Sequence, residues 1–445
     1  MLLDNLLLYS QKFFKDYYEK SSILKKIDWF IYASILLLIY SSAILPSDNI
    51  AIFAIFAIIF TMVKFLTKPR AGIVFSSAEK LLLLYFIFVL ISLAGSTLFL
   101  QSLKGFCKTL IYIGFYISVV NFLSENKSKI KYIILAIASV TFIEGLVAIK
   151  QNLISVSEIS GWQDMSRLNP EQIMTRVYGT LKPYNPNLFG GYMLAALPCN
   201  LLLIFLPLIN KHYKTAAVGL LFFVLALVTV VLTGCRGAYI ALFVEMLMIA
   251  SLTYKFLKPY YKKLFLICST FLAGLTATIV AILPALRARI LSIFAMRADS
   301  SNSFRFNVYN SCIEMFKDNW LLGIGVGNQN FREIYGLYMR TGFDALSAYN
   351  IYLEIAVESG IFALISFLGF VGVLIVQAIK YIMSKKRIEI IYLSIALISL
   401  SGILFHGFVD TVFFRPQIQF LFWIMIAIIR VITASRRARY GRVRN

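Results

Sequence analysis

The sequence predicts an all-α, polytopic integral membrane protein with about twelve transmembrane helices. Hydrophobic residues make up 60% of its 445 residues and charged residues only 14%, a balance far from that of soluble globular proteins. Apolar runs of about 20 residues, the length that crosses a bilayer, recur along the whole chain. No long hydrophilic stretch separates them, so we expect one integral membrane domain over residues 1–445.

The expected spans follow from these apolar runs in chain order. Their ranges are 28–46, 50–67, 79–99, 106–123, 131–150, 188–209, 215–234, 238–257, 264–283, 353–379, 388–407 and 418–433. The first 27 residues carry too many charges to form a cleavable signal peptide.

Lysine and arginine residues set the expected orientation, because cytoplasmic connections carry an excess of them. A cytoplasmic N-terminus collects most of these residues on one side and makes the C-terminus cytoplasmic as well. The connection 284–352 then becomes a large extracytoplasmic loop with short amphipathic helices. This loop keeps a positive surplus, which includes Arg332 and Arg340. An anionic ligand on the outer face would explain that surplus.

The net charge of +22 does not indicate nucleic acid, because the basic residues are distributed as topology determinants and lipid headgroup contacts. The five cysteines are scattered and none forms a CxxC pair, so no zinc or iron-sulfur site of familiar spacing is expected. We therefore predict neither a metal nor another cofactor.

Arg236 stands in "TGCRGAYIAL" (233–242), between two spans with almost no loop, so it must lie near the outer headgroup level. A guanidinium held there is well shaped to grip phosphate oxygens in a bidentate manner. The alternative is an arginine that caps the preceding helix or reaches a lipid phosphate.

The stretch "FRFNVYNSCIEMFKDNWLLG" (304–323) predicts an amphipathic helix suited to the membrane surface. Its apolar stripe consists of Phe306, Val308 or Tyr309, Cys312 or Ile313, Phe316 and Trp320. Arg305 stands at its start. The following "GIGVGNQNF" (323–331) has GxGxG spacing and no preceding strand, which excludes a dinucleotide loop and favours a glycine-rich turn.

Further polar residues stand at the ends of spans or within them. Asn185 and Asn187 belong to the turn "PYNPNLFGGY" (183–192), and "FHGFVDTVFFRP" (405–416) gathers His406, Asp410 and Arg415 on the outer side. Intramembrane carboxylates indicate function, either by pairing with an arginine or by proton transfer. They are Glu144, Glu245 and Glu358.

Taken together, these segments resemble the O-antigen ligase and polymerase superfamily. Its "SRG", "GxGxGxF" and "HNxYLExxxExG" elements correspond here to "CRGAYIAL", "GIGVGNQNF" and "YNIYLEIAVESG", between "RVYGTLKPYNPN" and "HGFVDTVFFRPQIQFLFW". The resemblance covers 175–430. Details of the last two segments are similar to a subgroup that contains cyanobacterial proteins once named for bicarbonate transport.

The resemblance implies a GT-C-like membrane glycosyltransferase in the bacterial inner membrane. Such enzymes move a glycan from undecaprenyl pyrophosphate to an acceptor sugar or other hydroxyl on the extracytoplasmic face, without a metal, alongside a flippase or chain-length regulator. Arg236 and Arg305 match the two key arginines of the family. Further substrate contacts are expected from polar residues of the shared region. They are Asn185, Asn187, Arg332, Arg340, Asn350, Tyr352, Glu354 and Arg415.

One position departs from the family pattern, because Tyr349 replaces the histidine that acts as base in the ligases. A phenol with a pKa of about 10 is a poor base at neutral pH. His406, Glu354 or Glu358 could supply the base, or early departure of the pyrophosphate could make a strong base unnecessary. Two other functions stay open: a small-anion transporter of the bicarbonate type, or a non-catalytic component of a polysaccharide assembly system.

Overall fold

The structure is a computed structural model that describes residues 2–69, 71–72, 75–154, 174–384 and 388–434. These residues form a bundle of helices, and no β-strand occurs among them. Eleven helices are long and apolar enough to cross a membrane, and the shorter apolar helix α4 (Ile27–Ser41) adds a twelfth. The predicted all-α, multi-pass membrane fold is confirmed.

Each predicted span coincides with one of these helices. They are α4, α5 (Ser47–Thr67), α6 (Ser77–Gly95), α7 (Phe99–Glu125), α8 (Ile130–Leu153), α9 (Pro186–Ala196) with α10 (Leu201–Ile209), α11 (Tyr213–Leu232), α12 (Arg236–Phe256), α13 (Pro259–Ile282), α17 (Ile351–Ser384), α18 (Glu389–His406) and α19 (Pro416–Thr433). Short helices α1 (Leu2–Phe13), α2 (Lys15–Lys20) and α3 (Ser22–Lys25) precede them.

The core of the bundle surrounds α19, of whose spanning window 94% is buried. Arg430, near the end of this helix, donates to Glu79 of α6 at 2.6 Å, and the Tyr116 hydroxyl of α7 donates to the same carboxylate at 3.0 Å. A buried charge needs such a partner, because an unpaired one is strongly destabilising. The ion pair therefore fixes α6, α7 and α19 together at the end of the bundle where α19 finishes.

The helix α17 is broken at Gly360, whose φ of 79° and ψ of 174° lie outside the helical region. The amides of Ile324 and Gly325 donate to the carbonyls of Val357 (3.0 Å) and Glu358 (2.9 Å), just before the break. A Cβ at position 360 would collide with the Leu321 carbonyl. The glycine-rich turn therefore satisfies backbone groups that the break would leave unpaired.

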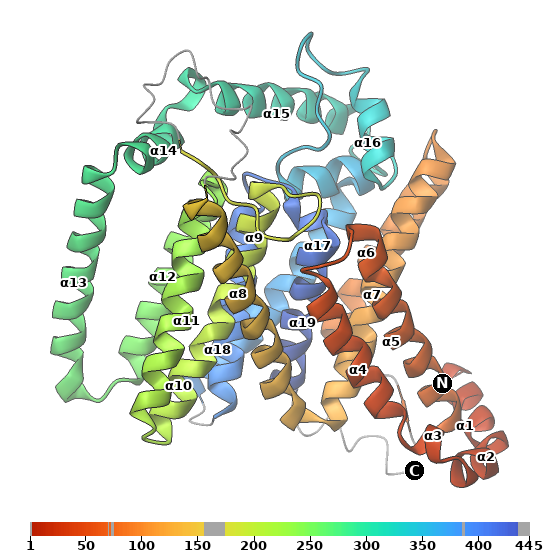
Figure 1. Ribbon diagram of the computed structural model, residues 1–445. Coiled ribbons are helices and arrows are strands. Elements are labelled where there is room, and N and C mark those ends of the chain that lie inside the picture. Colours follow the sequence, from red (N-terminus) through yellow and green to blue (C-terminus); the bar gives the residue numbers. More distant parts are fainter. Residues whose placement is uncertain (1, 70, 73–74, 155–173, 385–387, 435–445) are drawn as a thin grey trace.

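Three shorter helices cover one end of the bundle (Figure 1), which we call the cavity end. They are α14 (Pro284–Phe294), α15 (Ser300–Asp318) and α16 (Asn328–Tyr335). An amphipathic helix was predicted here, and part of its apolar stripe is buried. Val308 and Cys312 of the stripe are fully buried in a small separate core together with Met315, whereas Trp320 is 51% exposed. The stripe prediction is therefore confirmed at Val308 and Cys312 and wrong at Trp320, which lies beyond the end of α15 at Asp318.

The opposite end of the bundle carries the start of the chain. The helices α1, α2 and α3 lie there, and α19 also finishes at this end (Figure 1). Lys64 is buried there and contacts Asp28 at 2.7 Å and Glu125 at 3.1 Å. The first described helices and the last one therefore lie at the same end.

Candidate active site

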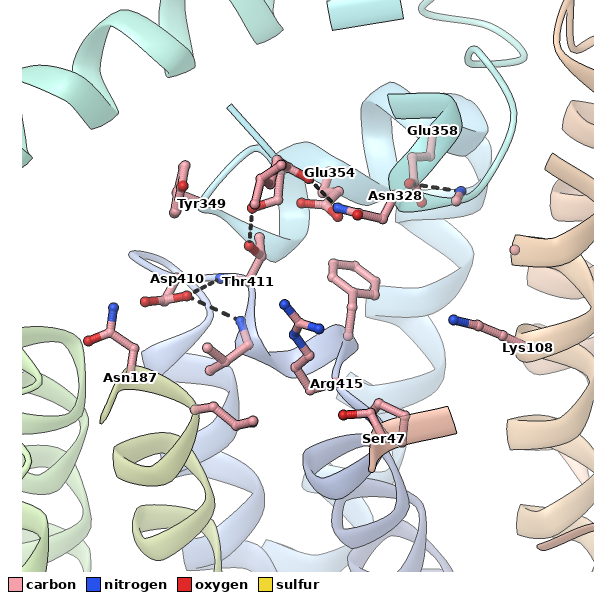
Figure 2. A pocket seen from close by; sticks show the side chains of 18 of the residues that line it. Ser47, Lys108, Asn187, Asn328, Tyr349, Glu354, Glu358, Asp410, Thr411 and Arg415 are labelled. Atoms are coloured by element: carbon pink, nitrogen blue, oxygen red, sulfur yellow. Dashed lines mark hydrogen bonds between the residues drawn. The ribbon is translucent and has the colours of Figure 1, made fainter. Parts of the chain in front are cut away.

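A cavity of about 1070 Å³ lies at the cavity end, beneath the covering helices. This volume is at the upper end of the range for small-molecule sites. Its wall combines the first turns of α5, α12, α17 and α19 with parts of α7, α14 and α15. Figure 2 shows side chains from these separate segments pointing into a shared space.

Five arginines line this cavity, and three of them, Arg236, Arg305 and Arg415, were predicted as site residues. Arg236 is the first residue of α12 and is 6% exposed. Its guanidinium lies 2.8 Å from Asp299 Oδ1 and donates to the Ser292 hydroxyl at 3.1 Å. The helix N-terminus adds its own positive field at this point. The arrangement suits an anionic ligand.

The other two arginines, Arg176 and Arg289, were not predicted as site residues. Their Nε atoms donate to the adjacent carbonyls of Thr233 and Gly234, both at 2.7 Å. Gly234 has a φ of 60°, and a Cβ there would lie 3.1 Å from Arg176 Cγ. The tight turn of "TGCRG" therefore holds both arginines beside the start of α12.

Burial and mutual repulsion act on these two arginines. Burial, followed by the charges of Arg176 and Arg236, lowers the pKa of Arg289 to about 9. Burial is also the main cause of a lowered pKa at Arg176, and Arg236 adds to it. Each shift means that the charged form costs free energy without a counterion. A bound anion would relieve that cost.

Arg305 lies on α15 and faces Asp410 at 3.7 Å. Its guanidinium carbon also lies 5.7 Å from the centre of the Tyr349 ring, within cation–π range. Its Nε is buried and has no hydrogen-bond partner among the described residues. Arg305 therefore brings an unsatisfied donor to the cavity wall.

Tyr349 lines the cavity with a φ of 50°, an unusual value for a residue other than glycine. Burial raises the pKa of its phenol, and Asp410 raises it further, while Arg305 acts in the opposite direction. The phenol stays protonated at neutral pH. It suits hydrogen-bond donation and ring contact better than proton abstraction.

Two carboxylates, Glu354 and Glu358, line the cavity one helical turn apart at the start of α17 (Figure 2). Glu354 Oε2 accepts from the Ala348 amide at 3.0 Å, and Glu358 Oε1 accepts from the Gly327 amide at 2.9 Å. These bonds fix both side chains before any substrate binds.

His406 is buried behind the cavity wall, and the cavity-lining residues do not include it. Its Nε2 lies 3.6 Å from Cys235 Sγ, and the ring packs closely on Gly191 and Gly237. Burial raises the pKa of the Cys235 thiol, but His406 outweighs this effect and the net shift is downward. The histidine therefore meets the thiol and not the open cavity.

Asn185 and Asn187 line the cavity, and both also hold local structure. Asn185 Oδ1 accepts from the amides of Asn187 and Leu188, which caps α9. Asn187 Oδ1 accepts from Arg176 at 2.5 Å. Asn187 therefore positions the arginine, and Asn185 fixes the first turn of the helix that carries Asn187.

Arg415 also lines the cavity, whereas Asn350 and Tyr352 are not among its lining residues. Asn350 Oδ1 accepts from the amide of Tyr352 at 2.9 Å and so caps α17. The Tyr352 hydroxyl donates to Leu404 O at 2.8 Å. These two residues hold the first turn of α17 in place.

Arg332 and Arg340 lie outside the cavity lining. Arg332 pairs with Asp344 at 3.0 Å, and both side chains are more than half exposed. Arg340 donates to Asn307 Oδ1 at 3.4 Å. The structure does not bring these two arginines to the cluster around Arg236.

No cluster of three or more histidine, cysteine, aspartate or glutamate residues able to hold a metal ion occurs in the described part of the chain. The cavity lining supplies positive charge of its own, from five arginines and two lysines.

Residues 221–368 match a family model described as O-antigen ligase. The matched region contains Arg236, Arg289, Arg305, Glu354 and Glu358. No curated protein matches the chain.

Proposed function

We propose that this chain transfers a glycan from undecaprenyl pyrophosphate to an acceptor hydroxyl, because residues 221–368 match a family model described as O-antigen ligase. One observation carries the proposal: Arg176, Arg236 and Arg289 come from three separate segments and lie together beside the first turn of α12, in a cavity that Arg305 also lines. A diphosphate carries the charge and the oxygen geometry that such guanidinium groups bind.

The reaction joins the acceptor oxygen to the anomeric carbon of the donor glycan. The bond from that carbon to the diphosphate oxygen breaks, and the lipid diphosphate leaves with the bonding electron pair. Arg176, Arg236, Arg289 and Arg305 stabilise the negative charge that develops on this leaving group. They act electrostatically, in the role that magnesium fills elsewhere, so the transfer requires no metal.

The acceptor hydroxyl loses its proton to a carboxylate at the start of α17. Glu358 is our choice for this base, with Glu354 beside it in the acceptor site, because both line the cavity and are fixed by backbone amides. His406 does not line the cavity. The phenol of Tyr349 acts as a hydrogen-bond donor in this proposal, and its ring positions Arg305.

Other residues support the site indirectly. Asn187 positions Arg176, and Asn185 fixes the first turn of α9. Asn350 and Tyr352 hold the start of α17. Our mechanism gives Arg332 and Arg340 no contact with the substrate.

In the cell, we place the protein in the bacterial inner membrane with the cavity on the extracytoplasmic face. The first helices and the end of α19 lie at the opposite end of the bundle, which supports two cytoplasmic termini (Figure 1). The connection 284–352 then forms the extracytoplasmic cover. A flippase that delivers the lipid-linked glycan is the expected partner.

The test is incubation of purified protein in liposomes with an undecaprenyl pyrophosphate glycan and candidate acceptors, with and without EDTA. We expect glycan transfer that survives EDTA. Tyr349→His should retain or raise the rate, since it restores the family residue. Absence of transfer with every acceptor, together with uptake of labelled bicarbonate by the same liposomes, would favour a transporter instead.

A further inference from the structure

A second group of cations lines the cavity besides the four arginines of the proposed donor site. Lys104 and Lys108 come from α7, and Arg415 directly precedes α19. Among the described residues, Arg415 and Lys104 form no ion pair, and Lys108 reaches only Asp48, at 3.4 Å, which is 83% exposed. We call these three residues the α7–α19 cations. They present more positive charge than the protein itself neutralises.

Lys108 lies across the cavity from the partners of the arginine cluster. In Figure 2, Asn187 and Asp410, the partners of Arg176 and Arg305, lie on one side, Lys108 lies on the other, and Arg415 lies between them. Glu354 and Glu358 lie on the wall above this space. Positive charge therefore extends across the cavity beneath the two carboxylates.

Two helix N-termini add to the positive charge of the α7–α19 cations. The helices α5 and α19 begin side by side, where Gln417 Nε2 donates to Ser47 Oγ at 3.1 Å. Ser47 and Pro416 both line the cavity. Helices of this length carry a partial positive charge at the N-terminus. The single carboxylate of Asp48 does not balance these helices and the three cations.

Contact with bilayer phosphates would explain exposed lysines near a membrane surface. Arg415 is also exposed, but it lines the cavity and directly precedes the most buried helix of the bundle, which a contact with bilayer phosphates does not explain. Figure 2 shows its guanidinium pointing into the cavity. A ligand inside the cavity is therefore the better partner.

We propose that Lys104, Lys108 and Arg415 form an anion subsite for the acceptor, distinct from the arginines that bind the donor diphosphate. The inference rests on the proposed function and adds a substrate class, because the acceptor must carry an oxyanion near its reacting hydroxyl. Two sources share this chemistry: the carboxylate of an acidic sugar, or the diphosphate of a second lipid-linked glycan. The second source would make the reaction a polymerisation.

The test compares three acceptors built on one glycan: a neutral methyl glycoside, the same glycan with a uronic acid, and the glycan on a short-chain lipid diphosphate. Undecaprenyl pyrophosphate first saturates the donor site, and the equilibrium Kd of each acceptor is then measured. The variant is Lys108→Gln combined with Arg415→Gln. Lys317→Gln, on exposed α15 surface outside the cavity lining, is the matched control.

In the double variant we expect at least about a tenfold rise in Kd for one or both charged acceptors, the size of a lost charge-assisted hydrogen bond. The neutral acceptor and the control should not change. Which charged acceptor responds identifies the source of the anion. Unchanged Kd values for both charged acceptors, or an equal rise for the neutral one, would overturn the subsite. Because this readout needs no transfer, failure of the proposed transferase reaction would be seen separately.

Discussion

Arg289 gives a quantitative test of the diphosphate cluster, since burial and two neighbouring arginines lower its pKa to about 9. Below that pH the guanidinium is already charged, and binding a diphosphate requires no proton from solvent. Above it, binding must also protonate Arg289, so the affinity should fall by up to about tenfold per pH unit. From pH 7 to pH 10 the expected loss is about tenfold.

The assay is calorimetric binding of a short-chain lipid diphosphate glycan to detergent-solubilised protein at four pH values from 7 to 10. At pH 7, Arg289→Gln should weaken binding roughly tenfold to a hundredfold, because one charge-assisted hydrogen bond of about 1.5–3 kcal/mol is lost. Above pH 9 the variant should lack the additional decline that the wild type shows. Every other titratable group is common to both proteins, so the difference isolates Arg289.

Arg287→Gln is the matched control, because Arg287 lies on the same helix but is exposed and donates only to Ala281 O. It should bind as the wild type does at every pH. Two results would refute the reasoning: a pH dependence shared equally by the wild type and Arg289→Gln, or an equal loss of affinity in both variants at pH 7.

Two further predictions concern the base and the backbone. Glu358→Gln should lower the initial rate of transfer by about 10²–10⁴-fold, as expected for loss of a general base. Tyr349→Phe keeps the ring beside Arg305, so its initial rate should fall by less than about tenfold. If Tyr349→Phe instead loses more activity than Glu358→Gln, the base is Tyr349. Gly360→Ala should destabilise the fold by more than about 1 kcal/mol, because alanine fits neither the φ of 79° nor the space at Leu321 O. Gly372→Ala has no atom within 4 Å of the added Cβ, so thermal unfolding should leave it near the wild type, and equal melting temperatures for the two variants would refute the strain argument.

The membrane helices could be predicted from the sequence because each depends on a local property, an apolar run of sufficient length. The break in α17 could not. The Leu321 carbonyl leaves no room for a Cβ at position 360. Leu321 lies after the end of α15, and only the packed structure brings it against α17.

The candidate site was predictable only in part for a similar reason. Arg236 and Arg305 stand in recognisable motifs, but Arg176 and Arg289 join them only through contacts with the turn at Thr233 and Gly234. The sequence marked both only weakly. Arg176 stands in "RVYGTLKPYNPN", and Arg289 is one of several basic residues in the connection 284–352. The position of His406 behind the wall likewise depends on the packing of α18 against the glycines of α9 and α12.

The central claim is that the arginine cluster stabilises a diphosphate leaving group during glycan transfer. Its most direct measurement is the single-turnover rate at which labelled glycan passes from undecaprenyl pyrophosphate to the acceptor in liposomes, for wild type, Arg236→Ala and Arg287→Ala. We predict that Arg236→Ala slows this step by about 10²–10³-fold, while Arg287→Ala matches the wild type. A rate in Arg236→Ala equal to that of the wild type would contradict the account.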